Sequence, residues 1–137
     1  MKKYNGDRPM NNNKKLMIET LQEIDNYLPK VMHAVQSMVS YFQGGNEQQA
    51  IEVFGPFTEA MQWLLDAITL TKSMQEEYDI HVSTQELEDV LPQLLEGWEN
   101  SDYILISDIL EYEILPILEQ WQGEIGKIKG VYTDDLE

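Results

Sequence analysis

The sequence predicts an all-α fold, a kinked up-down four-helix bundle with two longer and two shorter helices. Apolar residues recur at alternating spacings of three and four in four stretches, and short polar or glycine-containing links separate these stretches. No segment alternates apolar and polar residues over a useful length, as a half-buried strand would. The 137 residues are enough for one domain whose core needs neither a metal nor a disulfide.

The first helix is predicted from an apolar stripe that keeps one face against a partner helix. The stripe comprises Leu21, Ile24, Leu28, Val31, Val35, Met38 and Phe42. Gly44-Gly45 then ends the helix, because glycine adopts left-handed backbone angles at little cost. Asn46 is placed to cap the next helix, since its short polar side chain can accept a hydrogen bond from a first-turn amide.

The second helix shows the same pattern. Its stripe comprises Ala50, Phe54, Phe57, Met61, Leu64, Ile68 and Thr71. Because the register is kept across Gly55-Pro56, we expect a kink there and not a loop, so the two longer helices form an antiparallel hairpin. Each of the four predicted helices carries one proline and is expected to curve around the core. These prolines are Pro29, Pro56, Pro92 and Pro116.

The two shorter helices follow a connection at residues 76–82. Ser83 and Glu86 have the spacing of a capping box at the start of the third helix. Asp102 opens the fourth helix, where the helix dipole favours an acidic side chain. Because the apolar residues of the segment 103–121 cover most of its circumference, we expect the fourth helix to be the most buried.

Three segments make up the predicted domain organisation. Residues 1–14 form a flexible leader, because their polar composition offers nothing to bury. Residues 15–122 form the helical bundle, and residues 123–137 form a loose C-terminal tail marked by repeated glycines. The overhanging ends of the longer helices need a cover, for which the tail, a second copy of the chain in a homodimer, and a partner protein are open alternatives.

The composition excludes several classes of function. Nine basic against 25 acidic residues give a net charge of −16, which repels nucleic acid and anionic lipid, so we expect neither as a direct partner. The chain has no cysteine, which fits a reducing compartment and removes thiolate metal sites and thiol nucleophiles. No apolar run is long enough to span a membrane, and the N-terminus lacks the apolar core of a signal peptide. We therefore expect a cytoplasmic protein.

Metal and catalytic motifs are missing from the sequence. A di-iron site on a helical bundle needs Glu-x-x-His pairs, and neither His33 nor His81 has an acid three residues before it. Asp108 and Glu111 could form a cation-binding or hydrolytic site, a remote alternative, because a half-buried carboxylate can act as a general acid or a ligand. In the simpler interpretation, Asp108 hydrogen-bonds a tyrosine or the kinked backbone. We therefore expect no enzyme activity, cofactor or metal.

An uncompensated acidic surface is the feature that remains. Residues 73–126 contain fourteen acids and no lysine or arginine, more negative charge than solubility needs. Such a surface is either tolerated or relieved by a cationic partner. The candidate partner-binding residues are Glu86, Glu88, Asp89, Glu96, Trp98, Glu99 and Trp63.

Two functions fit this surface. The first is a non-enzymatic protein-interaction module, chaperone- or adaptor-like, whose apolar anchors bind a basic or amphipathic segment while the acids steer its approach. The alternative is an acidic regulator that mimics nucleic acid and occupies a DNA-binding protein. An exposed apolar groove flanked by acids favours the first function. Carboxylates spaced at the phosphate repeat along a surface without a groove favour the second.

The segment Ser101–Trp121, which begins SDYILISDILEYEILP, resembles the C-terminal stretch of uncharacterised small acidic helical proteins of Gram-positive bacteria. The resemblance covers a small part of the chain. It implies a bacterial cytosolic protein with an all-α fold and brings no known activity. In general character the chain is also similar to flagellar and secretion export chaperones, which are small acidic helical bundles.

Overall fold

Every secondary-structure element that the structure describes is helical. The computed structural model describes residues 7–131, with side chains from Asn13 onward. The elements are α1 (Asp7–Gln43), α2 (Glu47–Leu70), α3 (Lys72–Glu77), α4 (Gln85–Glu99), α5 (Tyr103–Ile109), the π-helical turn η1 (Leu110–Ile114), α6 (Leu115–Ile125) and the 3-10 helix η2 (Gly126–Gly130). This range contains no strand, which confirms the predicted all-α class.

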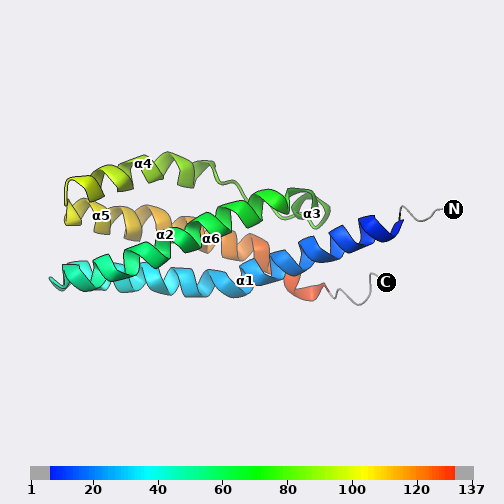
Figure 1. The fold of residues 1–137 in the computed structure, drawn as a ribbon, viewed down its shortest axis with the longest axis horizontal. Helices are drawn as coiled ribbons and strands as arrows, with labels where there is room; N and C mark the ends of the chain where they lie inside the picture. Colours follow the sequence, from blue (N-terminus) through cyan, green and yellow to red (C-terminus); the bar gives the residue numbers. More distant parts are fainter. Residues whose placement is uncertain (1–6, 132–137) are drawn as a thin grey trace.

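Helices α1 and α2 lie side by side and antiparallel, joined by a tight turn (Figure 1). Gly45 takes the left-handed backbone conformation, with φ of 78°, and the Asn46 N–H closes the turn by donating to the Tyr41 carbonyl at 2.7 Å. The predicted two-glycine turn is therefore confirmed. Asn46 is the N-cap residue of α2, but its side chain makes no capping hydrogen bond.

The two predicted apolar stripes form the centre of the core. On α1, every stripe residue from Leu21 to Met38 is buried, and Phe42 near the end of the helix is half-buried. On α2 and at its C-cap residue Thr71, every residue of the second stripe is buried. Side chains three and four residues apart share one face of a helix, so the alternation of these spacings was enough to identify the core face.

Helices α5, η1 and α6 follow one another without a break and form one continuous helical run. Pro116 has no N–H, and in an uninterrupted α-helix its ring would meet the carbonyl four residues earlier. The π turn just before it widens the backbone, so that the Leu115 N–H donates to the Leu110 carbonyl, five residues back. The other interior prolines lie within α1, α2 and α4, which confirms the predicted continuity of the helix across Gly55-Pro56.

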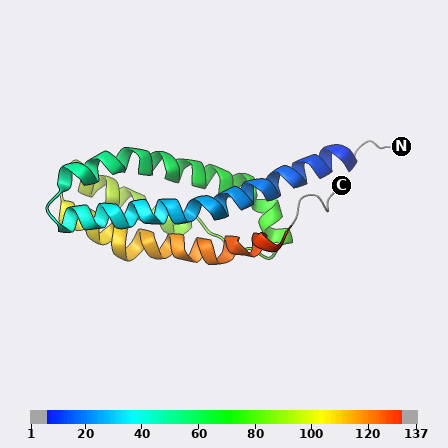
Figure 2. The same ribbon diagram turned by 90° about the horizontal axis from the view of Figure 1, so that it is seen from below.

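Helix α1 lies at the centre of the bundle, but the predicted fourth helix has the largest share of buried residues, as expected. Nine of the 23 residues 103–125 are buried, against nine of the 31 residues 13–43 of α1. Helix α1 packs against α2, α3, α5, η1, α6 and η2, and Figure 2 shows it between α2 and the run formed by α5 and α6. In that run, Ile104, Leu105 and Tyr112 are exposed, Ile104 by 78%. Their side chains are exposed because α5 and η1 are covered mainly by α1 and α4, and the faces turned away from both helices meet solvent.

The loop before α4 is tied to the C-terminal part of the bundle. The indole of Trp121 donates to the Ser83 carbonyl at 3.2 Å. Glu124 Oε1 accepts hydrogen bonds from the His81 N–H at 2.8 Å and from Lys127 Nζ at 2.9 Å. The first of these bonds, and then the second, hold the pKa of Glu124 below its ordinary value, because both stabilise the charged carboxylate. These contacts fix where α4 begins.

The starts of α4 and α5 differ in how well the sequence predicted them. The predicted capping box at Ser83 does not form, because Thr84 is the N-cap residue and the Ser83 Oγ accepts from the Gln85 N–H at 3.2 Å instead. At α5 the predicted acidic cap is confirmed, since the Leu105 N–H donates to Asp102 Oδ1 at 3.1 Å.

The segment after α6 packs against the bundle. Ile125 and Ile128 are buried, and Gln22 Nε2 on α1 donates to the Val131 carbonyl at 2.8 Å. The expectation of a loose tail is therefore wrong for residues 123–131. Apolar residues between the glycines, at the spacing that continues the face of α6, supply the contact.

The N-terminal part of α1 extends past the other helices (Figure 1). Because α1 begins at Asp7, residues 7–14 of the predicted leader are helical. Residues 1–6 and 132–137, which the predicted leader and tail also include, lie outside the described residues. Within residues 7–131, no helix combines the length and the apolar character that crossing a membrane requires.

Candidate functional site

The five predicted acidic residues of α4 are all exposed, but only Glu86 and Asp89 line a groove. These two lie three positions apart and so share a face of the helix. Glu96 and Glu99 also lie three positions apart, and Glu88 lies three turns before Glu99. The predicted acidic residues are therefore spread around α4 and do not form one surface.

The face of Glu86 and Asp89 borders a groove of about 580 Å³ between α4, η1 and α6, which we call the acidic groove. It is lined by Glu86, Asp89, Val90, Gln93, Tyr112, Glu113, Pro116, Ile117 and Gln120. The floor is apolar because Val90 and Ile117 are buried. The rim carries three exposed carboxylates and Tyr112, which is 69% exposed. These lining residues include no lysine or arginine.

Antiparallel packing of α4 against α5 and η1 builds this groove (Figure 1). On each wall the lining residues are three or four positions apart and so share a helix face. Asp89 Oδ1 accepts a hydrogen bond from Gln85 Nε2 at 2.8 Å, which holds the carboxylate at the rim. Tyr112 and Glu113 complete the opposite wall. Neither was among the predicted partner-binding residues, because their place opposite α4 depends on which helices pair.

Trp98 lies in an aromatic cluster at the hairpin end of the molecule. Its indole stacks on the Phe54 ring with centroids 3.8 Å apart, and it meets the Phe42 ring edge-on at 6.4 Å. Phe42 also stacks on Tyr103 at 5.4 Å. Trp98 therefore joins α4 to α1 and α2 and is half-buried, so its indole covers the core at the end of α4.

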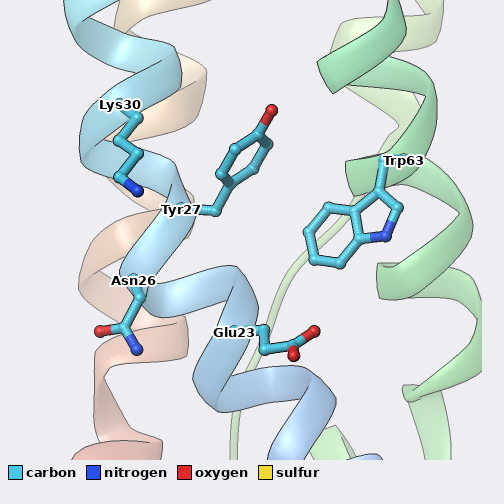
Figure 3. Close-up of a pocket in the computed structure, with 5 residues that line it drawn as sticks. All are labelled: Glu23, Asn26, Tyr27, Lys30 and Trp63. Atoms are coloured by element: carbon cyan, nitrogen blue, oxygen red, sulfur yellow. The ribbon is translucent and has the colours of Figure 1, made fainter.

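Trp63 lies on α2 beside a second groove of about 400 Å³ between α1 and α2, which we call the tryptophan groove. Its lining consists of Glu23, Asn26, Tyr27, Lys30 and Trp63 (Figure 3). Tyr27 and Trp63 meet edge to face, with ring centroids 5.4 Å apart and planes at 78°. A smaller hollow of about 130 Å³ adjoins it and shares Tyr27 and Lys30. Trp63 and the α4 acids therefore belong to different surfaces, and the seven predicted residues do not form one site.

Asp108 and Glu111 do not converge on a common cavity. Asp108 is exposed, not half-buried as expected, and borders a hollow of about 190 Å³ that Glu111 does not line. Glu111 Oε1 accepts from Gln43 Nε2 at 3.4 Å, and the negative charge of Glu111 raises the pKa of Tyr112 above its ordinary value. Within the part of the chain that the structure describes, no group of three or more acidic or histidine side chains is placed to hold a metal ion.

Comparison with known proteins gives a family. No curated protein and no solved structure matches the chain. A family model described as Domain of unknown function (DUF8042) matches residues 19–124, a range that contains every residue lining the acidic groove and the tryptophan groove. The chain therefore belongs to the family Domain of unknown function (DUF8042).

Proposed function

We propose that this protein is a non-enzymatic protein-interaction module, chaperone- or adaptor-like, that binds a basic or amphipathic segment of a partner protein in the acidic groove. One observation supports the proposal above others. A single groove combines an apolar floor, Val90 and Ile117, with three carboxylates and no basic side chain. Such a groove complements a segment whose apolar ridge runs between basic residues.

The length of the groove suits a short amphipathic helix. Along α4, Glu86 and Gln93 are seven residues apart, which is about 10 Å or two helical turns. A partner helix presents apolar side chains at the same spacing, at positions i, i+3 or i+4, and i+7. These side chains would bind on the floor of the groove. The carboxylates at its rim would accelerate the encounter and set the orientation of the helix.

The proposal includes a setting for this module. Its scaffold is a kinked up-down four-helix bundle in which residues 103–125 count as one helix. Its location is the bacterial cytoplasm, as the resemblance of Ser101–Trp121 implies. A homodimer is the less favoured cover for the exposed apolar side chains, because two copies with a net charge of −16 repel each other.

The test is a binding titration with a fluorescein-labelled amphipathic peptide made of leucine and lysine, followed by anisotropy. Glu86→Gln, Asp89→Asn and Glu113→Gln together remove the three rim charges while keeping the side-chain shapes. We expect this triple variant to bind the peptide about tenfold more weakly, because each lost charge pair contributes a fraction of a kcal/mol.

The matched control removes three charges elsewhere. Glu19→Gln, Glu52→Gln and Asp66→Asn change exposed residues of α1 and α2 and remove the same amount of negative charge. We expect this control to bind the peptide nearly as wild type does. Equal loss in both triple variants would mean that total charge, and not the acidic groove, attracts the peptide.

The nucleic-acid mimic is kept as a second candidate because Glu88 and Glu99 are exposed outside the acidic groove. A DNA-binding protein that binds a row of carboxylates in place of phosphates would depend on these two residues as much as on Glu86 and Asp89. The double variant Glu88→Gln, Glu99→Gln therefore separates the two functions. In the interaction-module proposal it leaves peptide binding close to wild type.

A further inference from the structure

The tryptophan groove has the chemistry of a cation site. Trp63 is 39% exposed although it is a large aromatic side chain, and Tyr27 stands across from it at a near right angle. The two rings therefore form the adjacent walls of a corner. The faces of aromatic rings carry negative potential and attract cations, most strongly for tryptophan.

A carboxylate completes this corner. Figure 3 shows the Glu23 side chain reaching from α1 toward Trp63, whereas Asn26 and Lys30 remain on the other side of Tyr27. The negative charge of the groove therefore lies on the side of Trp63, and its positive charge lies beyond the Tyr27 ring. A cation placed against Trp63 meets Glu23 first.

The smaller hollow beside this corner is apolar. Val31, Ala34, Val53, Pro56, Phe57 and Ala60 line it together with the shared residues Tyr27 and Lys30. The shared residues place the hollow one to two turns along α1 from Glu23, about 6 to 10 Å. A ligand with a cationic group at one end and an apolar group near it would contact both parts.

We propose that the tryptophan groove binds an arginine side chain of a bound polypeptide. The planar guanidinium stacks on the Trp63 ring, and two of its N–H groups donate to the Glu23 carboxylate. An apolar residue close to this arginine in the partner occupies the smaller hollow. The inference rests on the proposed function only in taking the ligand to be a polypeptide, and it makes no use of the acidic groove.

Arginine fits this corner better than the other candidates. The ammonium of lysine is compact and strongly hydrated, so it neither stacks on a ring nor matches the fork geometry of a carboxylate. A second copy of this chain is disfavoured by mutual repulsion at a net charge of −16. An anionic ligand would meet Glu23 on the Trp63 side of the groove, and only Lys30 would attract it.

The test uses two probes that differ only in charge. N-acetyl-arginine methylamide carries the guanidinium, and N-acetyl-citrulline methylamide replaces it with a neutral urea of nearly the same shape. Each probe is titrated at constant ionic strength while the tryptophan emission and the indole N–H signal of Trp63 in a proton–nitrogen correlation spectrum are followed. We expect saturable binding of the arginine probe with a Kd on the order of 1 mM, and binding of citrulline about fivefold weaker.

Three variants locate the site. Trp63→Phe removes the Trp63 signals and so identifies them. The other two indoles should respond less to the probe, because Trp121 is buried and Trp98 is half-buried in the aromatic cluster. Glu23→Gln should remove the preference for arginine over citrulline, and Glu19→Gln, which changes an exposed acid one turn earlier on α1, should keep it. The lysine probe, N-acetyl-lysine methylamide, should bind more weakly than the arginine probe.

The inference would be overturned if neither the emission nor the Trp63 indole signal changed saturably with the arginine probe. Equal affinity for the arginine and citrulline probes would also overturn it. So would an unchanged preference for arginine over citrulline in the Glu23→Gln variant. The same titration in the Glu86→Gln, Asp89→Asn, Glu113→Gln variant keeps the two proposals apart. Arginine binding that survives there supports the tryptophan groove whatever the peptide titration shows. Its loss there would mean that the probe binds in the acidic groove.

Discussion

The acidic groove and the tryptophan groove are both gaps between antiparallel helices, but they are lined by different chemistry. The acidic groove lies between α4 and the run of η1 and α6, and its rim carries charges of one sign. The tryptophan groove lies between α1 and α2 and carries one acid, one base and two aromatic rings. The comparison teaches that two grooves of similar helical geometry differ in chemistry because their outer residues differ, and the two proposed ligands follow from that difference.

The two grooves also differ in how firmly their walls are held. Helix α1 packs against six other elements, whereas α4 packs mainly against α5 and η1. Helix α4 is fixed to the hairpin of α1 and α2 by Trp98 and to α6 through the loop contacts of Trp121 and Glu124. We therefore expect the α4 wall of the acidic groove to open more easily than either wall of the tryptophan groove.

The largest expected effect is that of Trp98→Ala. Removing the indole deletes its stacking on Phe54 and leaves a cavity where α4 meets the hairpin, which should lower the free energy of unfolding by about 3 kcal/mol. Urea unfolding measures this loss. Hydrogen exchange should show α4 amides losing more protection than those of α1 and α2. Equal loss in all three helices would contradict the difference in wall stability.

A smaller effect is expected from salt. Binding of the leucine–lysine peptide to the acidic groove depends on three exposed carboxylates, so its affinity should fall about tenfold as salt rises from low to several times physiological concentration. Arginine binding in the tryptophan groove depends on one carboxylate and two rings, so its affinity should fall less than about threefold. Titrations of both ligands over one salt series check this. Equal slopes would remove the proposed distinction between the grooves.

The third effect concerns pH and the loop before α4. Hydrogen bonds from His81 and Lys127 lower the pKa of Glu124 below 4.5, so this carboxylate stabilises the fold above pH 4.5, and the contribution is lost as pH falls through the lowered pKa. Glu124→Gln should therefore be less stable than wild type at pH 7. The difference in the free energy of unfolding between the two proteins should become smaller in acid below that pKa. Urea unfolding midpoints of both proteins at pH 7 and in acid measure this difference.

Glu119→Gln is the matched control, since it removes an exposed acid of α6 outside this network. We expect its stability difference from wild type to change less with pH than that of Glu124→Gln. Because the network fixes α4, peptide binding in the acidic groove should also weaken in the Glu124 variant. Arginine binding in the tryptophan groove should stay unchanged. A parallel loss in both grooves would mean that the variant loosens the whole fold.

The core of the α1–α2 hairpin could be predicted from the sequence, because burial there follows local periodicity. Stripe residues such as Leu28 and Leu64 lie at spacings of three and four, and that pattern alone assigns them to the inner face. The exposed apolar positions of the fourth helix could not be predicted in this way. Ile104 and Tyr112 are as apolar or aromatic as their buried neighbours, and only the positions of α1 and α4 decide that they face solvent.

The site could be predicted only in part, for a related reason. The exposure of Glu86 and Asp89 follows from their charge and their place on an amphipathic helix. Their partners Tyr112 and Glu113 follow from an interhelical pairing that no local pattern encodes. The roles of Trp63 and Trp98 likewise depend on tertiary contacts, since Phe54 and Phe42 cover one indole while the other lies beside an open groove.

The smallest expected effect is a shift in the pKa of Tyr112, which reports the negative potential at the rim of the acidic groove. The charge of Glu111, its hydrogen bond and then the charge of Asp108 raise this pKa above 10.0, because they disfavour the tyrosinate. Glu111→Gln should lower the pKa toward 10.0, and Asp108→Asn should lower it less. Ultraviolet titration measures it, with Tyr112→Phe to identify the signal. An unchanged pKa in the Glu111 variant would show that solvent screens these carboxylates completely. In that case the acids at the nearby rim would steer a basic partner far more weakly than the proposed function requires.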